Sequence, residues 1–227
     1  MKWKVQLDNI KNNKLIIKKD SNKELIITEY FQEQELSIVV EENAQLMIKQ
    51  EYIQDTPIII KLIMTVEKNA QVMHELFIKT SSTIACTYEF KLVGAGSSVK
   101  SCGFIHGINQ SSSVIRVEQL HKEINTESLV SFKTVLDDKA VYNYQGLIVI
   151  DNNANNAKAS QQDKVLLLNS ETTATSVPSL QVDCNAVLCS HASAISCIND
   201  DQLIMFLFRG ITKKEAKKLI IAGFLKH

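Results

Sequence analysis

The chain has few of the residues that usually shape tight turns, with only seven glycines and two prolines among 227 residues. Two-residue hairpin turns depend on glycine, most often as Asn-Gly or Asp-Gly, so a fold made of ordinary hairpins is not favoured. An excess of charge of one sign is also lacking, because 25 basic residues balance 25 acidic residues. Nucleic-acid-binding proteins usually carry a strong positive charge, so we expect no nucleic-acid partner.

Long apolar runs are missing as well. The most apolar stretch, Ile58 to Val66, is interrupted by Lys61 and is much shorter than the roughly 20 residues that cross a membrane. The N-terminal residues reach Lys11 and Lys14 without the apolar segment of a targeting signal. We therefore expect no membrane partner. The odd number of cysteines, five, favours reduced thiols in the cytoplasm over a disulfide framework.

Short apolar bursts rich in isoleucine and valine take the place of long runs. Examples are Leu15–Ile17, Leu25–Ile27, Leu36–Val40 and Ile58–Ile60. Such bursts are too short for helices, and β-branched side chains suit the pleated surface of a sheet. The sequence therefore predicts a body made mainly of short β-strands.

A small turn recurs between these bursts. Glu42–Met47 is echoed by Lys68–Met73, 26 positions later, and Gly94–Val99 follows after about the same interval. Asn153-Ala154 and Asn185-Ala186 resemble the same turn. A strand–turn–strand unit that recurs every 20 to 26 residues predicts a β-solenoid, in which each coil buries its inner face on its neighbours. An antiparallel sandwich with asparagine turns is the alternative.

The pattern changes at Asn199, where a helix is expected to begin. Asn199–Gln202 combines an asparagine cap with acidic residues and a glutamine at the capping-box position, and the helix would end at Gly210. A second helix would begin at the Thr212–Glu215 capping box. The sequence thus predicts a β body over residues 1–199 and a two-helix segment over residues 200–227.

The first of these helices is apolar on every side, because Leu203 to Phe208 are six consecutive apolar residues. A helix of this kind has to be buried on more than one face. Either a second protein packs on it, or the second helix and the β body cover it. Four lysines of the second helix are expected to form a solvated face, with phosphate contact as a less favoured alternative: Lys213, Lys214, Lys217 and Lys218.

Reactive side chains are most concentrated at Cys189 and His191. Alternate residues of a strand share a face, and two residues of strand rise separate their Cα atoms by roughly 6.5 Å. That separation is too long for a nucleophile–base pair but suits two ligands of iron, an iron–sulfur cluster or zinc. Cys184 and Cys197, or another subunit, would have to supply further ligands. The alternative is a small buried thiol beside a surface imidazole.

Motifs typical of enzymes are missing. No nucleotide-binding G-x-x-x-x-G-K-[ST] loop and no G-x-S-x-G elbow occur, and the adjacent pairs Asp137-Asp138 and Asp200-Asp201 are not the facing carboxylates of a glycosidase. A polysaccharide-cleaving β-helix enzyme is therefore disfavoured. Without the nucleotide-binding loop, we do not expect the chain to hydrolyse nucleotides by itself.

The C-terminal half, over about 110 residues, resembles the SufB/SufD family, the scaffold components of SUF iron–sulfur cluster assembly. Segments that match family motifs occur in the family's order. These are His121 with Thr126 and Ser128, Leu136–Lys139, Tyr144–Val149, Ala157 with Gln161 and Leu166–Leu168, Pro178–Val182, Cys189–His191, Asp201–Leu203 and Arg209–Ile211. The Cys-Ser-His triplet and the proline-containing strand are nearer to SufD. Residues 1 to 110 match only as a generic β-helix, and the family's N-terminal helical region is missing.

The resemblance implies a right-handed parallel β-helix with a C-terminal helical hairpin and a scaffold function without catalysis. Such chains pair through their β-helices with a SufB/SufD-like subunit, and each binds the ATPase SufC through its C-terminal helices. The resemblance assigns His191 to a transient iron–sulfur cluster at the subunit interface, with Cys189 as a plausible second ligand. It places the ATPase contact on Leu203, Phe206, Leu207, Phe208, Arg209, Gly210, Ile211, Ile220 and Phe224. The alternative is a self-pairing β-solenoid module without cluster chemistry.

Overall fold

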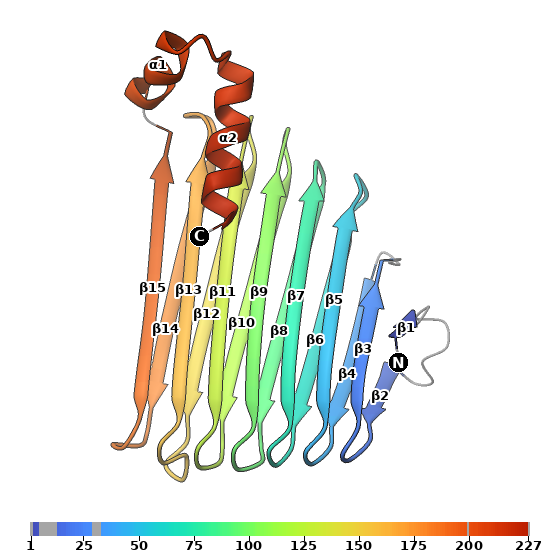
Figure 1. The fold of residues 1–227 in the computed structure, drawn as a ribbon. Coiled ribbons are helices and arrows are strands. Elements are labelled where there is room, and N and C mark those ends of the chain that lie inside the picture. The colour runs from blue at the N-terminus through green and yellow to red at the C-terminus, as the bar shows by residue number, and fades with distance from the viewer. Residues whose placement is uncertain (1, 5–12, 29–32, 199, 227) are drawn as a thin grey trace.

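A computed structural model describes the chain except for residues 1, 5–12, 29–32, 199 and 227. Within the described residues, fifteen strands form two sheets whose strands are all parallel to their neighbours. Figure 1 shows the two sheets facing each other, with the strands stacked in chain order from β1 to β15 and the helices at the β15 end. The predicted parallel β-solenoid is confirmed, and the antiparallel sandwich is wrong.

Consecutive strands alternate between the two sheets, so each coil contributes one strand to each. The eight-stranded sheet contains β1 (Lys2–Lys4), β3 (Asn22–Ile27), β5 (Gln45–Ile53), β7 (Gln71–Thr80), β9 (Ser98–Gly107), β11 (Glu127–Leu136), β13 (Lys158–Leu167) and β15 (Leu188–Cys197). The seven-stranded sheet contains β2 (Lys14–Ile17), β4 (Glu33–Val40), β6 (Ile58–Val66), β8 (Thr83–Leu92), β10 (Ser112–His121), β12 (Val141–Ile150) and β14 (Thr173–Val182).

The core lies between the two sheets. Burial alternates residue by residue along most strands, as in β7, because every second side chain points inward. Apolar and aromatic side chains fill the interior, with Tyr52, Tyr88, Phe90 and Phe132 among the largest that are fully buried. The short isoleucine- and valine-rich bursts therefore form strands because each of them supplies one layer of this core.

The recurring turn forms one corner of the solenoid. Asn43 and Asn69 occupy this corner in successive coils with positive φ angles of 58° and 54°, and Gly96 follows with 71°. Asparagine and glycine tolerate this left-handed conformation better than other residues. The amide of Asn69 donates a hydrogen bond to Oδ1 of Asn43 at 3.2 Å, and the amide of Asn43 donates to Oδ1 of Asp20 at 2.9 Å. The turn thus links neighbouring coils as well as reversing the chain.

The coils lengthen toward the C-terminus, which the sequence repeat does not predict. Corner residues bonded to each other are 23 positions apart at Asp20 and Asn43, 26 at Asn43 and Asn69, and 31 at Asn125 and Asn156. The predicted interval of 20 to 26 residues is therefore wrong for the later coils. Strands from β7 onward reach ten residues, and the turn between β12 and β13 is longer than its predecessors.

Two helices follow the last strand. Helix α1 spans Asp200–Phe208 and α2 spans Lys213–Lys226. The chain leaves α1 through Gly210, which has a φ of 75°, and the side chains of Thr212 and Glu215 bond reciprocally to each other's backbone N–H groups at the start of α2. The predicted glycine stop and capping box are confirmed, whereas the predicted cap at Asn199 lies outside the described residues.

Candidate functional site

The last coil leaves the C-terminal end of the solenoid uncovered. Among the described residues, β14 and β15 are the end strands of the two sheets, so each has one side without a paired strand. Most of their residues are exposed and none is buried, whereas half of the residues of β12 and of β13 are buried. Neither edge strand contains a charged residue, and β14 carries Pro178. We refer to β14 and β15 together as the open coil.

Cys189 and His191 lie on the inward-facing side of β15. Cys189 is in register with Ala159 and His191 with Gln161, both of which are buried inside the solenoid on β13. Parallel register places side chains of one row on the same face, so the prediction that Cys189 and His191 share a face is confirmed. His191 is exposed because no further coil covers it, while Cys189 is half-buried.

Cys189 packs against a small apolar cluster that also contains Cys184. Burial raises the pKa of the Cys189 thiol, so the chain by itself favours the protonated form. The Cys184 thiol donates a hydrogen bond to Oδ1 of Asn155 at 3.3 Å. A metal ion would have to displace the thiol proton of Cys189, because only a thiolate is a strong metal ligand.

Cys197 lies in the same inward-facing row as His191 but at the opposite end of β15. Six residues of strand separate their Cα atoms by roughly 20 Å, which excludes a shared metal ion within one chain. Cys86 is buried in the core, and Cys102 lies half-buried on β9. Across the described residues, no three His, Cys, Asp or Glu side chains converge as a metal site. A cluster at Cys189 and His191 would therefore need ligands from outside this chain.

A polar layer that sequence reasoning missed lies directly beneath the open coil. Asp163 is 1% exposed on β13, where it is in register with Ser193 of β15, and its Oδ1 accepts a hydrogen bond from the hydroxyl of Tyr142 at 3.0 Å. Burial raises the pKa of Asp163 to about 6. Gln161, beneath His191, accepts a hydrogen bond from the amide of Gln119 at 3.0 Å. The sequence signal for this layer was a charged residue, Asp163, at an inward-facing strand position.

The two helices differ in what they leave exposed. On α1, Leu203 is buried and Phe206 half-buried, but Leu207 is exposed and the side chain of Phe208 is 87% exposed. Ile220 and Phe224 on α2 are half-buried, and they pack against the cluster formed by Val135, Leu166 and Leu168 of the β body. Of the connecting residues predicted to bind a partner, Arg209 and Gly210 are exposed and Ile211 is half-buried.

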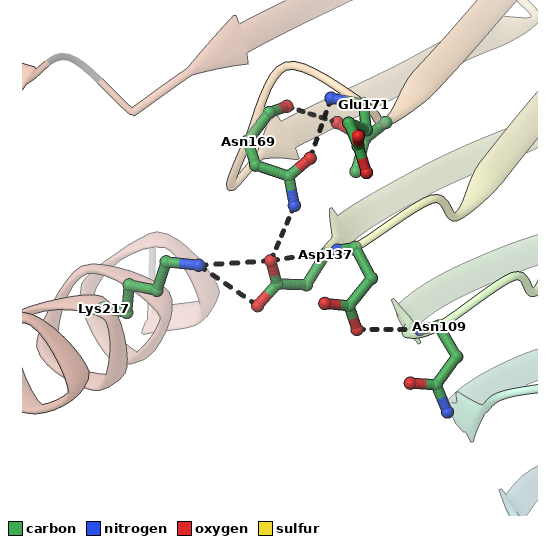
Figure 2. A network of polar contacts seen from close by, with 7 residues as sticks. Asn109, Asp137, Asn169, Glu171 and Lys217 are labelled. Carbon is green, nitrogen blue, oxygen red and sulfur yellow. Dashed lines mark hydrogen bonds and ion pairs between the residues drawn. The ribbon is translucent and has the colours of Figure 1, made fainter.

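The four lysines of α2 that were expected to form a solvated face also differ in their exposure. Lys213, Lys214 and Lys218 are exposed, as expected for a solvated face. The ammonium group of Lys217 instead binds both carboxylate oxygens of Asp137, at 3.1 and 3.3 Å (Figure 2). Ile220, Phe224 and Lys217 of α2 thus face the chain's own solenoid, whereas α1 and the residues that follow it carry most of the exposed part of the predicted surface.

Comparison with known families decides the assignment. The family described as the SufBD core domain of the SUF system for iron–sulfur cluster assembly matches residues 5–224, nearly the whole chain. This chain belongs to the SufBD family. The match extends through the N-terminal coils, where the sequence motifs alone had shown only a generic β-helix.

Individual SufBD proteins are distant in sequence and much longer. An iron–sulfur cluster assembly SufBD family protein of Synechocystis sp. is 27% identical over 150 residues, which cover 66% of this chain and 31% of that protein. A SufBD family protein of Staphylococcus saprophyticus is 27% identical over 109 residues, which cover 48% of this chain and 23% of the relative. The matched region thus spans less than a third of these relatives. Among the described residues, no helix is both long and apolar enough to cross a membrane.

Proposed function

We propose that this chain is a scaffold subunit of a SUF-type iron–sulfur cluster assembly complex and that it has no catalytic activity of its own. The observation that carries the proposal is the open coil. Both of its edge strands are uncharged, and one of them, β15, carries an inward-facing cysteine and histidine. Long edge strands without charges invite pairing with another chain. The open coil is thus the surface for a second SufBD-family subunit, which can be a homologue or a second copy.

An iron–sulfur cluster is the cargo at this interface and forms transiently there. Cys189 offers a thiolate and His191 an imidazole, which are ligands used for iron in such clusters. The partner subunit supplies the remaining ligands and excludes water. The five cysteines are all free thiols, which supports a reducing compartment such as the cytoplasm.

A SufC-like ATPase is the proposed partner of the helical segment. The exposed apolar side chains of α1, with Phe208 the most exposed, form a surface that a second protein would cover. Ile220 and Phe224 pack α2 against the solenoid instead, so they are less available to a partner. In this proposal the ATPase contacts α1 and the Arg209–Ile211 connection directly.

The pairing test uses a lysine at Ser193, an inward-facing position on β15. Sedimentation velocity of the chain, alone and mixed with SufBD-family subunits from the same genome, is expected to show a dimer that Ser193→Lys abolishes, because pairing would bury the added charge. Val141→Lys is the matched control, because Val141 is exposed on β12 away from the edge. A wild-type chain that stays monomeric in every mixture contradicts the proposal.

The cluster test compares two histidines. After anaerobic reconstitution of the paired chains with iron and sulfide, His191→Ala is expected to retain less iron than wild type, whereas His106→Ala, on the outward face of β9, should retain as much. Equal iron in all three would support the alternative, a self-pairing module without cluster chemistry. The lack of three converging ligands in the described part of the chain is what keeps that alternative open.

The ATPase test compares two phenylalanines. Phe208→Asp is expected to weaken binding of the SufC-like ATPase without unfolding the chain, since Phe208 is already in solvent. Phe77→Asp introduces the same change at a partly exposed position on the outward face of β7 and should leave binding unchanged. ATPase binding that is insensitive to Phe208→Asp would place the contact elsewhere.

A further inference from the structure

Helix α2 contacts the solenoid at the end where β14 begins and β15 finishes. Ile198, the residue after β15, packs in the same cluster as Ile220, Ile221 and Phe224 of α2. The backbone N–H of Ile198 also donates a hydrogen bond to the carbonyl of Leu167 at 3.0 Å. The C-terminal end of β15 is therefore held between α2 and β13.

Asp137 connects the same helix to the start of β14 (Figure 2). It follows β11, and its carboxylate accepts hydrogen bonds from Lys217 of α2 and, at 2.9 Å, from the side-chain amide of Asn169. Asn169 lies in the loop that leads into β14, where its Oδ1 accepts a hydrogen bond from the N–H of Glu171 at 2.9 Å. One carboxylate thus bridges α2, β11 and the loop that positions β14.

A second polar contact secures the C-terminal end of α2. Lys133 on β11 is only 7% exposed, and its ammonium donates hydrogen bonds to the carbonyls of Phe224 and Leu225 at 3.0 and 3.3 Å. The same ammonium lies 5.9 Å from the centre of the Phe224 ring. A lysine that caps the last carbonyls of a helix stabilises its C-terminal turn and fixes its position. Helix α2 is consequently held at two points about two turns apart.

We propose that α2 is a clamp that keeps the open coil stacked on the solenoid, with Asp137, Lys217 and Lys133 as its positioning residues. No strand in the described part of the chain pairs with the outer side of the open coil, so its two strands rely on β12, β13 and the contacts at their ends. Release of α2 removes the apolar cover from Ile198 and the support of the loop before β14. Strand β15, which carries Cys189 and His191, then becomes less well ordered. Any effect of the clamp on pairing with a second subunit rests on the proposed function. The clamp itself does not depend on that proposal.

Hydrogen exchange of the isolated chain tests the clamp without any partner. Lys217→Met is expected to accelerate exchange about tenfold both in α2 and in residues 188–197, because both then open more often. Exchange in β5, β7 and β9 should stay unchanged. Lys214→Met removes the same charge from an exposed position of α2 and should change neither segment, and Lys217→Arg should restore protection because it can still pair with Asp137.

One further variant and one further background keep the test decisive. Asp137→Asn loses the charge that binds Lys217 but keeps an oxygen that can accept a hydrogen bond from it, and should give a smaller acceleration than Lys217→Met in the same two segments. If the chain pairs with itself, the series is repeated on a Ser193→Lys background, where a partner no longer shields β15. Faster exchange in α2 with unchanged exchange in residues 188–197 would overturn the clamp, as would unchanged exchange in both. A clamp confirmed in a chain that binds no partner would leave this inference standing while the proposed function fails.

Discussion

The hydroxyl of Tyr142 on β12 donates a hydrogen bond to Oδ1 of Asp163 on β13, at 3.0 Å, and so joins the two sheets through the interior. Both side chains are buried, at the layer immediately beneath the open coil. Burial of the carboxyl group raises the pKa of Asp163 to about 6, although the hydrogen bond from Tyr142 acts in the opposite direction.

The first prediction concerns the pH dependence that follows. The pKa of Asp163 is higher in the fold than the ordinary value of 3.8, so its stabilising contribution is complete below pH 3.8 and is lost as pH rises through about 6. The loss amounts to about 3 kcal/mol at most. Asp163→Asn keeps the acceptor for Tyr142 without the charge. The difference in unfolding free energy between variant and wild type, from urea titrations at pH 4 to 7.5, should therefore grow in favour of the variant as pH rises. A difference independent of pH would contradict this.

A second prediction concerns two buried histidines. Burial lowers the pKa of His74 to about 3 and that of His121 to about 4. Both rings are held by hydrogen bonds in their neutral form, His74 to Ser101 and Gln50, and His121 to Thr126 and Ser128. Each lowered pKa gives a contribution that is complete above the ordinary value of 6.5 and is lost as pH falls toward the folded pKa.

The measurement for these histidines is NMR of their ring protons. Between pH 8 and 5 the chemical shifts of His74 and His121 should remain constant, because the folded chain does not protonate either ring in that range. Each histidine should cost about 1.4 kcal/mol of unfolding free energy per pH unit below 6.5, until its own folded pKa is reached. Rings that titrate near pH 6.5 would show that water reaches this part of the interior.

A third prediction addresses the corner of the solenoid. Asn69→Ala should lower the unfolding free energy by about 1–2 kcal/mol, because alanine is unfavourable at a φ of 54° and the hydrogen bond to Asn43 is lost. Asn69→Gly should cost less, since glycine tolerates this conformation, as Gly96 does one coil later. Equal costs of the two substitutions, measured by urea unfolding, would assign the effect to the lost side-chain bond alone.

A fourth prediction compares two glycines in different surroundings. A Cβ atom at Gly94 would lie 2.0 Å from the backbone nitrogen of Lys68 on the preceding coil, so Gly94→Ala must push two coils apart. We expect a loss of about 3 kcal/mol. A Cβ atom at Gly223 on α2 would meet nothing within 4 Å, so Gly223→Ala should raise stability by about 0.5–1 kcal/mol through helix propensity. Calorimetry of both variants checks the contrast, and a tolerated alanine at position 94 would show that the coils are further apart than described.

Local features of the chain were predictable because each is encoded within a few residues. The apolar bursts at Leu36–Val40 and Ile58–Ile60 became strands, and the Thr212–Glu215 box began a helix. Cys189 and His191 fall on one face because strand parity alone decides it. The repeat length was predictable only for the early coils, since later turns gain residues without altering the local pattern around each strand.

Contacts between distant residues were not predictable in the same way. Lys217 and Asp137 are 80 positions apart, and neither has neighbours that reveal its partner. The sequence therefore determined that the chain alternates buried and exposed residues, turns at asparagines and ends in two helices, because those choices depend on local conformational preference. Only the tertiary structure decided that α2 lies on the solenoid while α1 stays exposed, and that Cys189 and His191 occupy an uncovered coil. Both outcomes depend on which coil is last in the stack and on how far each coil extends, and no short segment of sequence contains that information.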